Sequence, residues 1–309
     1  MTSSRLSPLA FGSVILCILI WAGQSVAVKS SLEGLPPFLV ILCRFSLSLP
    51  LLYLFSRIQG AVLAVPKGSR WFVALNSAFL SLQIALFTLG TDRSTSINSI
   101  ILIHTFPFFS ALLAPVLLPD ERWRLMSLLG ILVAFLAVPV LIAPTERISS
   151  GPFAIGDLML VGAAFIMGAK IVLMKRLLRE SSAVQLTFWD SLLAVLLFGM
   201  LTFFFERDTP LTWTAESLSG LLYQGIVVST VGFLLWLSLL KRYSPNRLNI
   251  FRLLTPAVGV FLGNLLLQEA LDARIFLSLL LVCLGLFLVH LDSQKKIDTS
   301  AASSPTSGD

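Results

Sequence analysis

The chain carries the same kind of segment twice. "HTFPFFSALLAPVLLPDERWR" runs from His104 to Arg124, and "LTPAVGVFLGNLLLQEALDAR" runs from Leu254 to Arg274. Each has a proline near its start, then a run of apolar or small residues, then an acid followed by a basic residue. Aligning the acids Glu121 and Glu269 sets an offset of 148 residues (269 minus 121). The repetition predicts that the chain consists of two related halves.

The composition places both halves in a membrane. Of 309 residues 56% are hydrophobic and only 12% charged, which is more apolar side chain than a soluble core can bury. A bilayer core of about 30 Å needs about 20 mostly apolar residues per helix. Short polar stretches divide the chain into ten such segments, near 9–28, 38–55, 71–90, 97–118, 125–143, 156–174, 184–205, 218–240, 248–268 and 275–291. Runs such as "LLGILVAFLAVPVLIA" are apolar on every side, unlike barrel strands, so we expect an all-α integral membrane protein.

Five spans in each half is an odd number, so the second half must enter the membrane from the opposite side. We therefore expect an inverted repeat, a recurring plan of transporters whose substrate site lies near the midplane. The expected divisions are a tail 1–8, a first repeat 9–143, a loop 144–153, a second repeat 154–291 and a disordered tail 292–309. Small residues recur at the same spacing after each acid and predict close helix contacts: Gly130 and Ala137, then Ser278 and Gly285.

The loop charges predict the orientation. If the N-terminus is cytoplasmic, fourteen Lys and Arg residues lie on that side and five on the other, counted from the printed sequence. The positive-inside rule then puts both termini in the cytoplasm of a bacterial inner membrane. This asymmetry accounts for the net charge of +6, which is therefore no sign of nucleic-acid binding. The first span is long and lacks a cleavage pattern, so we expect a retained anchor.

Several stretches resemble one transporter family. They are "WAGQSVAVK" (21–29), Arg44, the 107–121 segment, "GDLMLVGAAFIMGAKIVLMKR" (156–176) and "PAVGVFLGNLLLQE" (256–269). With ten spans and the duplication, the chain resembles the EamA-type transporters of the drug/metabolite transporter superfamily over about residues 11–291. The resemblance implies two five-helix repeats and transport of small metabolites.

Four ionisable side chains lie inside predicted spans: Arg44, Lys170, Asp190 and Arg252. Each costs about 2.5 to 3.5 kcal/mol to insert, so such groups normally face a cavity or a partner. Asp190 is placed to neutralise Lys170 or Arg252, and both pairings stay open. Snorkelling of the two long cations to the headgroups is an alternative.

Other candidates are uncharged or lie at helix ends. Pro107 and Pro256 free the carbonyls one turn earlier and predict kinks that hinge a gate or shape packing. His104, one turn before the first kink, would bind substrate, carry a proton or simply be hydrogen bonded inside the bundle. Trp21, beside Gln24, is either a cavity wall or core packing. Trp189 and Trp236 are expected in aromatic belts at the helix ends.

Glu121 and Glu269 are expected to cap the helix that follows each or to close a gate through a salt bridge.

The sequence favours a carrier over an enzyme. It contains no Walker loop, no nucleophile-elbow glycines and no carboxylate cluster, and its cysteines, Cys17, Cys43 and Cys283, are spaced as packed thiols rather than metal ligands. We expect no cofactor and no metal. The hypothesis is an alternating-access exporter of amino acids or related compounds, as a monomer or homodimer. Proton coupling through Asp190 or His104, facilitated diffusion and exchange all stay open, and an intramembrane enzyme or a signalling protein is the alternative.

Overall fold

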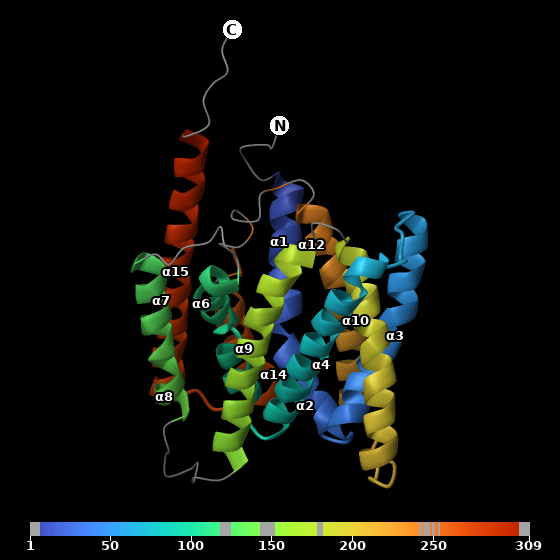
Figure 1. The fold of residues 1–309 in the computed structure, drawn as a ribbon. Coiled ribbons are helices and arrows are strands. Elements are labelled where there is room, and N and C mark those ends of the chain that lie inside the picture. The colour runs from blue at the N-terminus through green and yellow to red at the C-terminus, as the bar shows by residue number, and fades with distance from the viewer. Residues whose placement is uncertain are drawn as a thin grey trace.

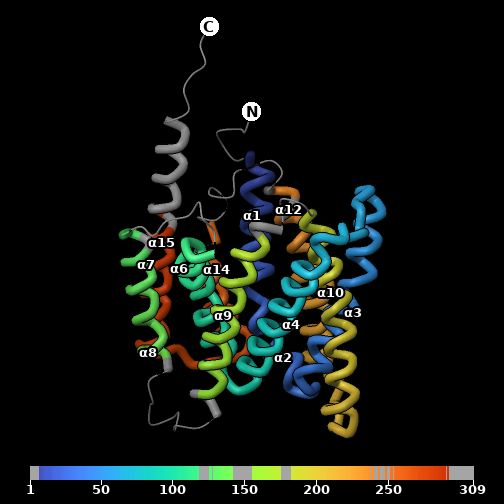
Figure 2. The backbone as a smooth tube through the Cα atoms, viewed as in Figure 1, coloured from blue at the N-terminus to red at the C-terminus, as the bar shows by residue number. Residues whose placement is uncertain are grey.

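The computed structural model describes residues 7–117, 125–142, 152–177, 182–240, 243, 248, 251–252 and 254–302. Within these ranges the chain is a bundle of helices without strands, as predicted (Figure 1). The first helix begins and the last helix ends at the same end of the bundle, called here the terminal end (Figure 2). The end of η2 (Thr202–Glu206) lies at the opposite end of the bundle.

The first half forms five spans, numbered in chain order. Their helices are α1 (Pro8–Ala22) and α2 (Gln24–Leu32), α3 (Pro37–Ile58), η1 (Lys67–Ser69) with α4 (Arg70–Asp92), α5 (Ser96–Ile103) with α6 (Phe106–Leu117), and α7 (Leu125–Phe135) with α8 (Ala137–Ile142). The second half begins with α9 (Pro152–Leu177) and α10 (Ala183–Leu201) with the π-helix η2 (Thr202–Glu206). It continues with α11 (Ala215–Leu222), the π-helix η3 (Tyr223–Gly232) and α12 (Phe233–Leu240), then α14 (Thr255–Leu267) and α15 (Ala273–Ala302).

These helices confirm the ten predicted spans. In the described residues seven helices are long and apolar enough to cross a membrane, and three shorter apolar helices, 128–141, 255–267 and 273–289, complete the set. Large apolar side chains cover the outside, for example Phe205, 73% exposed, and Leu280, 63% exposed. Such a surface is stable only against lipid, because in water it would be a large unpartnered apolar patch.

The pairing of spans 5 and 10 confirms the inverted repeat. Helices α7 and α15 pack side by side, at the left of the bundle in Figure 1. A Cβ on Gly130 would lie 2.7 Å from the carbonyl oxygen of Gly285, and Ser278 Oγ donates to the Ala137 carbonyl at 3.2 Å. With the offset of 148, Gly130 corresponds to Ser278 and Ala137 to Gly285. Each contact is therefore the twofold image of the other, as in an isologous interface.

Span 1 is interrupted where span 8 touches it. Helix α1 ends and α2 starts on either side of Gly23, and a Cβ there would meet Tyr223 Oη at 2.6 Å. The Tyr223 hydroxyl lies 3.0 Å from the Ile20 carbonyl oxygen and donates to it. The Tyr223 hydroxyl thus satisfies a backbone carbonyl at the break. Only glycine at position 23 leaves room for the Tyr223 side chain.

The last helix is longer than the sequence suggests. α15 continues to Ala302, although residues 292–309 are predicted to be disordered. The segment after the membrane contains Gln294, Lys295 and Lys296, which are good helix formers and extend a helix already nucleated in span 10.

Candidate functional site

A buried ion pair joins spans 6 and 7. Lys170 Nζ of α9 lies 2.8 Å from Asp190 Oδ2 of α10. The other oxygen, Asp190 Oδ1, accepts hydrogen bonds from Asn76 Nδ2 at 2.8 Å and Ser77 Oγ at 2.7 Å, both on α4. The Asp190 residue is 3% exposed. Of the two partners left open by the sequence, the structure selects Lys170.

These four residues, Asn76, Ser77, Lys170 and Asp190, are called the Asp190 cluster. It joins the halves, because α4 belongs to the first and α9 and α10 to the second. Sequence reasoning missed Asn76 and Ser77, although two adjacent polar residues inside "FVALNSAFL" could have signalled them. Three donors on one carboxylate stabilise its charge without water.

Arg252 lies among aromatic rings rather than beside an acid. Its Cζ lies 4.9 Å from the ring centroid of Trp21, 5.4 Å from that of Trp236 and 5.8 Å from that of Phe106. The two tryptophans also pack edge to face at 5.2 Å. Rings at these distances attract a cation through their quadrupoles. Trp236 therefore packs against Trp21 and Arg252 of the protein.

Trp189, the other tryptophan expected in a belt, is also tied to the protein. Its Nε1 donates a hydrogen bond to the Leu63 carbonyl at 2.7 Å. The indole thus holds the segment between spans 2 and 3 against α10.

The predicted proline kinks are breaks between helices. Span 4 stops after Ile103 and restarts at Phe106, and α14 starts at Thr255. Pro107 and Pro256 are each the second residue of the new helix, where a missing N–H costs little.

His104 forms the C-cap of α5 at the first break. Its Nδ1 lies 2.7 Å from the Ile100 carbonyl oxygen, and because a carbonyl only accepts, Nδ1 carries the proton. The ring centroid of His104 lies 6.3 Å from that of Phe106, the ring that Arg252 Cζ approaches to 5.8 Å. The structure therefore brings His104, Trp21 and Arg252, three predicted candidates, into one neighbourhood.

Two other candidates lie apart from these groups. Arg44, 7% exposed, donates from Nε to Ser229 Oγ on η3 at 3.0 Å. Gln24 is half-buried at the first position of α2. Within the described residues neither shares a hydrogen bond or ion pair with the Asp190 cluster or with Arg252.

Glu269 caps a helix, but not the one that follows it. Its carboxylate oxygens accept from the backbone N–H groups of Ser96 at 2.6 Å and Ile97 at 2.8 Å, at the start of α5. The expectation of a cap on the following helix is therefore wrong, because Asp272 holds that place and accepts from the Ile275 N–H at 3.0 Å. Glu121 lies outside the described residues.

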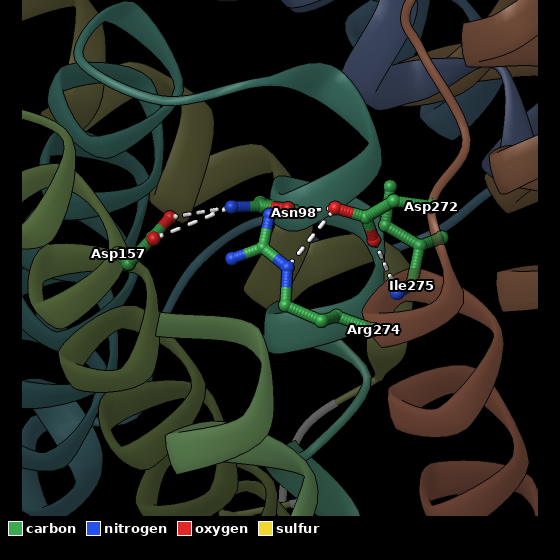
Figure 3. A network of polar contacts seen from close by, with 5 residues as sticks. All are labelled: Asn98, Asp157, Asp272, Arg274 and Ile275. Atoms are coloured by element: carbon green, nitrogen blue, oxygen red, sulfur yellow. Dashed lines mark hydrogen bonds and ion pairs between the residues drawn. The ribbon is translucent and has the colours of Figure 1, made fainter. Parts of the chain in front are cut away.

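Asp272 also pairs with Arg274, whose Nη2 lies 2.6 Å from its carboxylate (Figure 3). Partial burial raises the pKa of Asp272, but the hydrogen bonds from Arg274 and from the Ile275 N–H outweigh it and lower the pKa overall. The start of α15 thus keeps a negative charge, which its dipole favours.

A third acid links the halves at the end opposite the termini. Asp157 of α9 accepts a hydrogen bond from Ser94 Oγ. It also accepts from Asn98 Nδ2 at 3.2 Å (Figure 3). Lys29 of α2 donates to three carbonyls at the end of α4, those of Thr91, Asp92 and Ser94, at 2.7 to 3.0 Å. With Glu269, these contacts are called the opposite-end layer. Sequence reasoning missed Asp157 because it stands near the start of a span.

Ten apolar helices in two inverted halves, with polar groups of both halves meeting inside the bundle, define a multi-pass membrane transporter. The EamA-like transporter family matches this chain twice, over residues 9–143 and 154–291. The chain belongs to that family.

Relatives across bacteria agree with this class. The chain is 23% identical to the "Uncharacterized transporter YoaV" of Bacillus subtilis, over 89% of this chain and 94% of that protein. It is 24% identical to a "Probable amino-acid metabolite efflux pump" of Escherichia coli, over 89% of this chain and 92% of that protein. The chain is also similar to one solved crystal structure, with a TM-score of 0.65 and 20% sequence identity. The match covers 93% of this chain and 98% of the chain in that structure, and it supports the fold alone.

Proposed function

We propose that this protein is a secondary transporter that exports amino acids or related small organic metabolites by alternating access. The observation that carries the proposal is the Asp190 cluster, in which charged and polar groups from both halves meet inside an apolar bundle. Buried ionisable groups are costly in a membrane, and in transporters they mark substrate or ion pathways. The name of the Escherichia coli relative supports the substrate class.

The opposite-end layer supports alternating access. Glu269 and Asp157 belong to the second half, and the groups that they hold, at Ser94 to Asn98, belong to the first. With these contacts made, the two halves are held together at that end. Opening there requires the contacts to break, and rocking of one repeat against the other is how inverted-repeat carriers expose their site in turn.

The positive-inside rule places the terminal end in the cytoplasm, so the opposite-end layer closes the outer face. Substrate would enter this conformation from the cytoplasm, which is the direction required for export. Proton coupling would use a group that can lose its charge inside the bundle, and Asp190, tied to Lys170, is the candidate.

The test is uptake into proteoliposomes. Purified protein reconstituted in liposomes preloaded with one unlabelled amino acid should accumulate the same labelled amino acid faster than empty liposomes, for at least one of the common amino acids. If transport is coupled to protons, a pH gradient of either sign across the liposome membrane should change the rate of uptake. Correctly inserted protein that moves none of the amino acids would contradict the proposal.

A further inference from the structure

The two interrupted spans are equivalent, and so are the residues at their breaks. With the offset of 148, His104 corresponds to Arg252. His104 lies after α5, about 12 Å from the start of that helix at 1.5 Å per residue. Arg252 lies before α14, a helix about 20 Å long by the same rise. Both breaks therefore lie within the membrane, one in each half.

Arg252 differs from Lys170 in that no carboxylate among the described residues pairs with it. Lys170 is neutralised by Asp190, and the Arg44 guanidinium is buried against Ser229. For Arg252 the described residues supply the three rings of Trp21, Trp236 and Phe106, but no carboxylate and no hydrogen-bond acceptor. Rings attract the face of a guanidinium and leave its N–H edges without partners.

Arg252 as a residue is partly exposed rather than fully buried. A guanidinium presents parallel N–H groups that match the two oxygens of a carboxylate. His104 adds a second function, because in the neutral ring the Nδ1 proton is donated to the Ile100 carbonyl and Nε2 is an acceptor. An acceptor near a guanidinium suits a zwitterion that carries an ammonium group beside its carboxylate.

We infer that Arg252, set between Trp21 and Trp236 at the paired helix breaks, binds the carboxylate of the transported substrate. The inference rests on the proposed function and narrows its substrate class to compounds with a free carboxylate. The rings hold the guanidinium in place and exclude water from the ion pair, which strengthens it. His104 is assigned the ammonium group of an amino acid.

The experiment compares each of the twenty common L-amino acids with its carboxamide, which keeps the amine and the side chain but loses the anionic carboxylate. Binding is measured by thermal shift of the purified protein, and transport by uptake into proteoliposomes. The variants are Arg252→Gln, Arg252→Lys and the matched control Arg207→Gln, a surface arginine whose side chain is 62% exposed.

For the wild type we expect at least one amino acid to bind about tenfold or more tightly than its carboxamide, the effect of a lost charge-assisted pair. Arg252→Gln should bring the ratio of the two affinities close to one, because it weakens binding of the amino acid but not of the carboxamide. Arg252→Lys should retain part of the preference for the amino acid, and Arg207→Gln should retain all of it. If Arg252 had only a structural role, Arg252→Gln would weaken binding of the amino acid and of the carboxamide equally, or would change neither affinity. Either result overturns the inference.

The two proposals fail differently. Transport that does not distinguish amino acid from carboxamide contradicts the carboxylate site and keeps the proposed function. Carboxylate binding that requires Arg252 without transport contradicts the proposed function and keeps the site. Wild-type protein that neither binds nor transports any of the twenty amino acids overturns both.

Discussion

The Asp190 carboxylate lies where water cannot solvate it, so its charge depends on Lys170, Asn76 and Ser77. A single substitution therefore removes a counter-charge from a buried partner. The loss of stability from removing one partner is larger than the net contribution of the ion pair to stability, because an uncompensated charge remains buried.

Asp190→Asn is expected to lower the free energy of unfolding by about 3 kcal/mol and to depress transport while still allowing insertion. The matched variant is Asp190→Asn combined with Lys170→Met, which removes both charges. Thermal unfolding in detergent and uptake into proteoliposomes measure the two effects. The double variant should be more stable than the single one, and a larger loss in the double variant would count against the pairing.

Glu269 acts on a helix distant in sequence, because two backbone N–H groups at the start of α5 have no partner within their own helix. Glu269→Gln keeps one acceptor and removes the charge, which should weaken the cap by about 1 kcal/mol. Hydrogen exchange at Ser96 and Ile97 should become about fivefold faster, by the same energy. The control Glu216→Gln, in the exposed first turn of α11, should leave this exchange unchanged.

At the scale of elements, the approach of spans 5 and 10 depends on residues without side chains. A Cβ on Gly285 would lie 2.6 Å from the Gly130 carbonyl oxygen and 2.8 Å from Ala134 Cβ, and backbone cannot move away as a flexible side chain does. Membrane helices gain their association from such packing, since lipid tails are as apolar as the helices.

Gly285→Ala should therefore lower the melting temperature, because separating the helices costs about 1 to 3 kcal/mol of packing. Gly12→Ala is the matched control, since a Cβ there has nothing within 4 Å, and the gain in helix propensity should keep or raise stability. Differential scanning fluorimetry of the two variants compares them directly. Equal melting temperatures would mean that the α7–α15 contact tolerates the extra methyl group.

At the scale of the whole molecule, the direction of each span decides at which face of the membrane the loop after it lies. Residues 59–69 follow α3 at the terminal end, and residues 207–214 follow η2 at the opposite end. The positive-inside rule predicts that the terminal end is cytoplasmic, and on that prediction the second loop should be accessible from outside the cell.

Single cysteines test this in a background in which the three native free thiols are replaced. Thr209→Cys should react with a membrane-impermeant maleimide added to intact cells, and Gly68→Cys should react only after the cells are opened. Both positions are exposed, so access to each depends on the side of the membrane. Labelling of both from outside would contradict the inverted halves, and the reverse pattern would contradict the orientation.

Sequence alone determined the number of spans, the repeat and four of the charged residues inside the spans, Arg44, Lys170, Asp190 and Arg252. The excess of apolar residues and the length of each run are local quantities that the bilayer converts directly into helices. The spacing of Gly130, Ala137, Ser278 and Gly285 could also be compared between the halves without a structure, and the contact between α7 and α15 confirms it.

Only the tertiary structure decided which residues the buried charged and polar side chains contact. Which helix faces meet depends on the rotation and tilt of every span together, so the choice of Lys170 for Asp190 could not be read from spacing. The same holds for Trp236 beside Arg252 and for Glu269 at α5, contacts that join residues of different helices. A membrane specifies which segments cross it, whereas packing between the segments specifies what their polar groups touch.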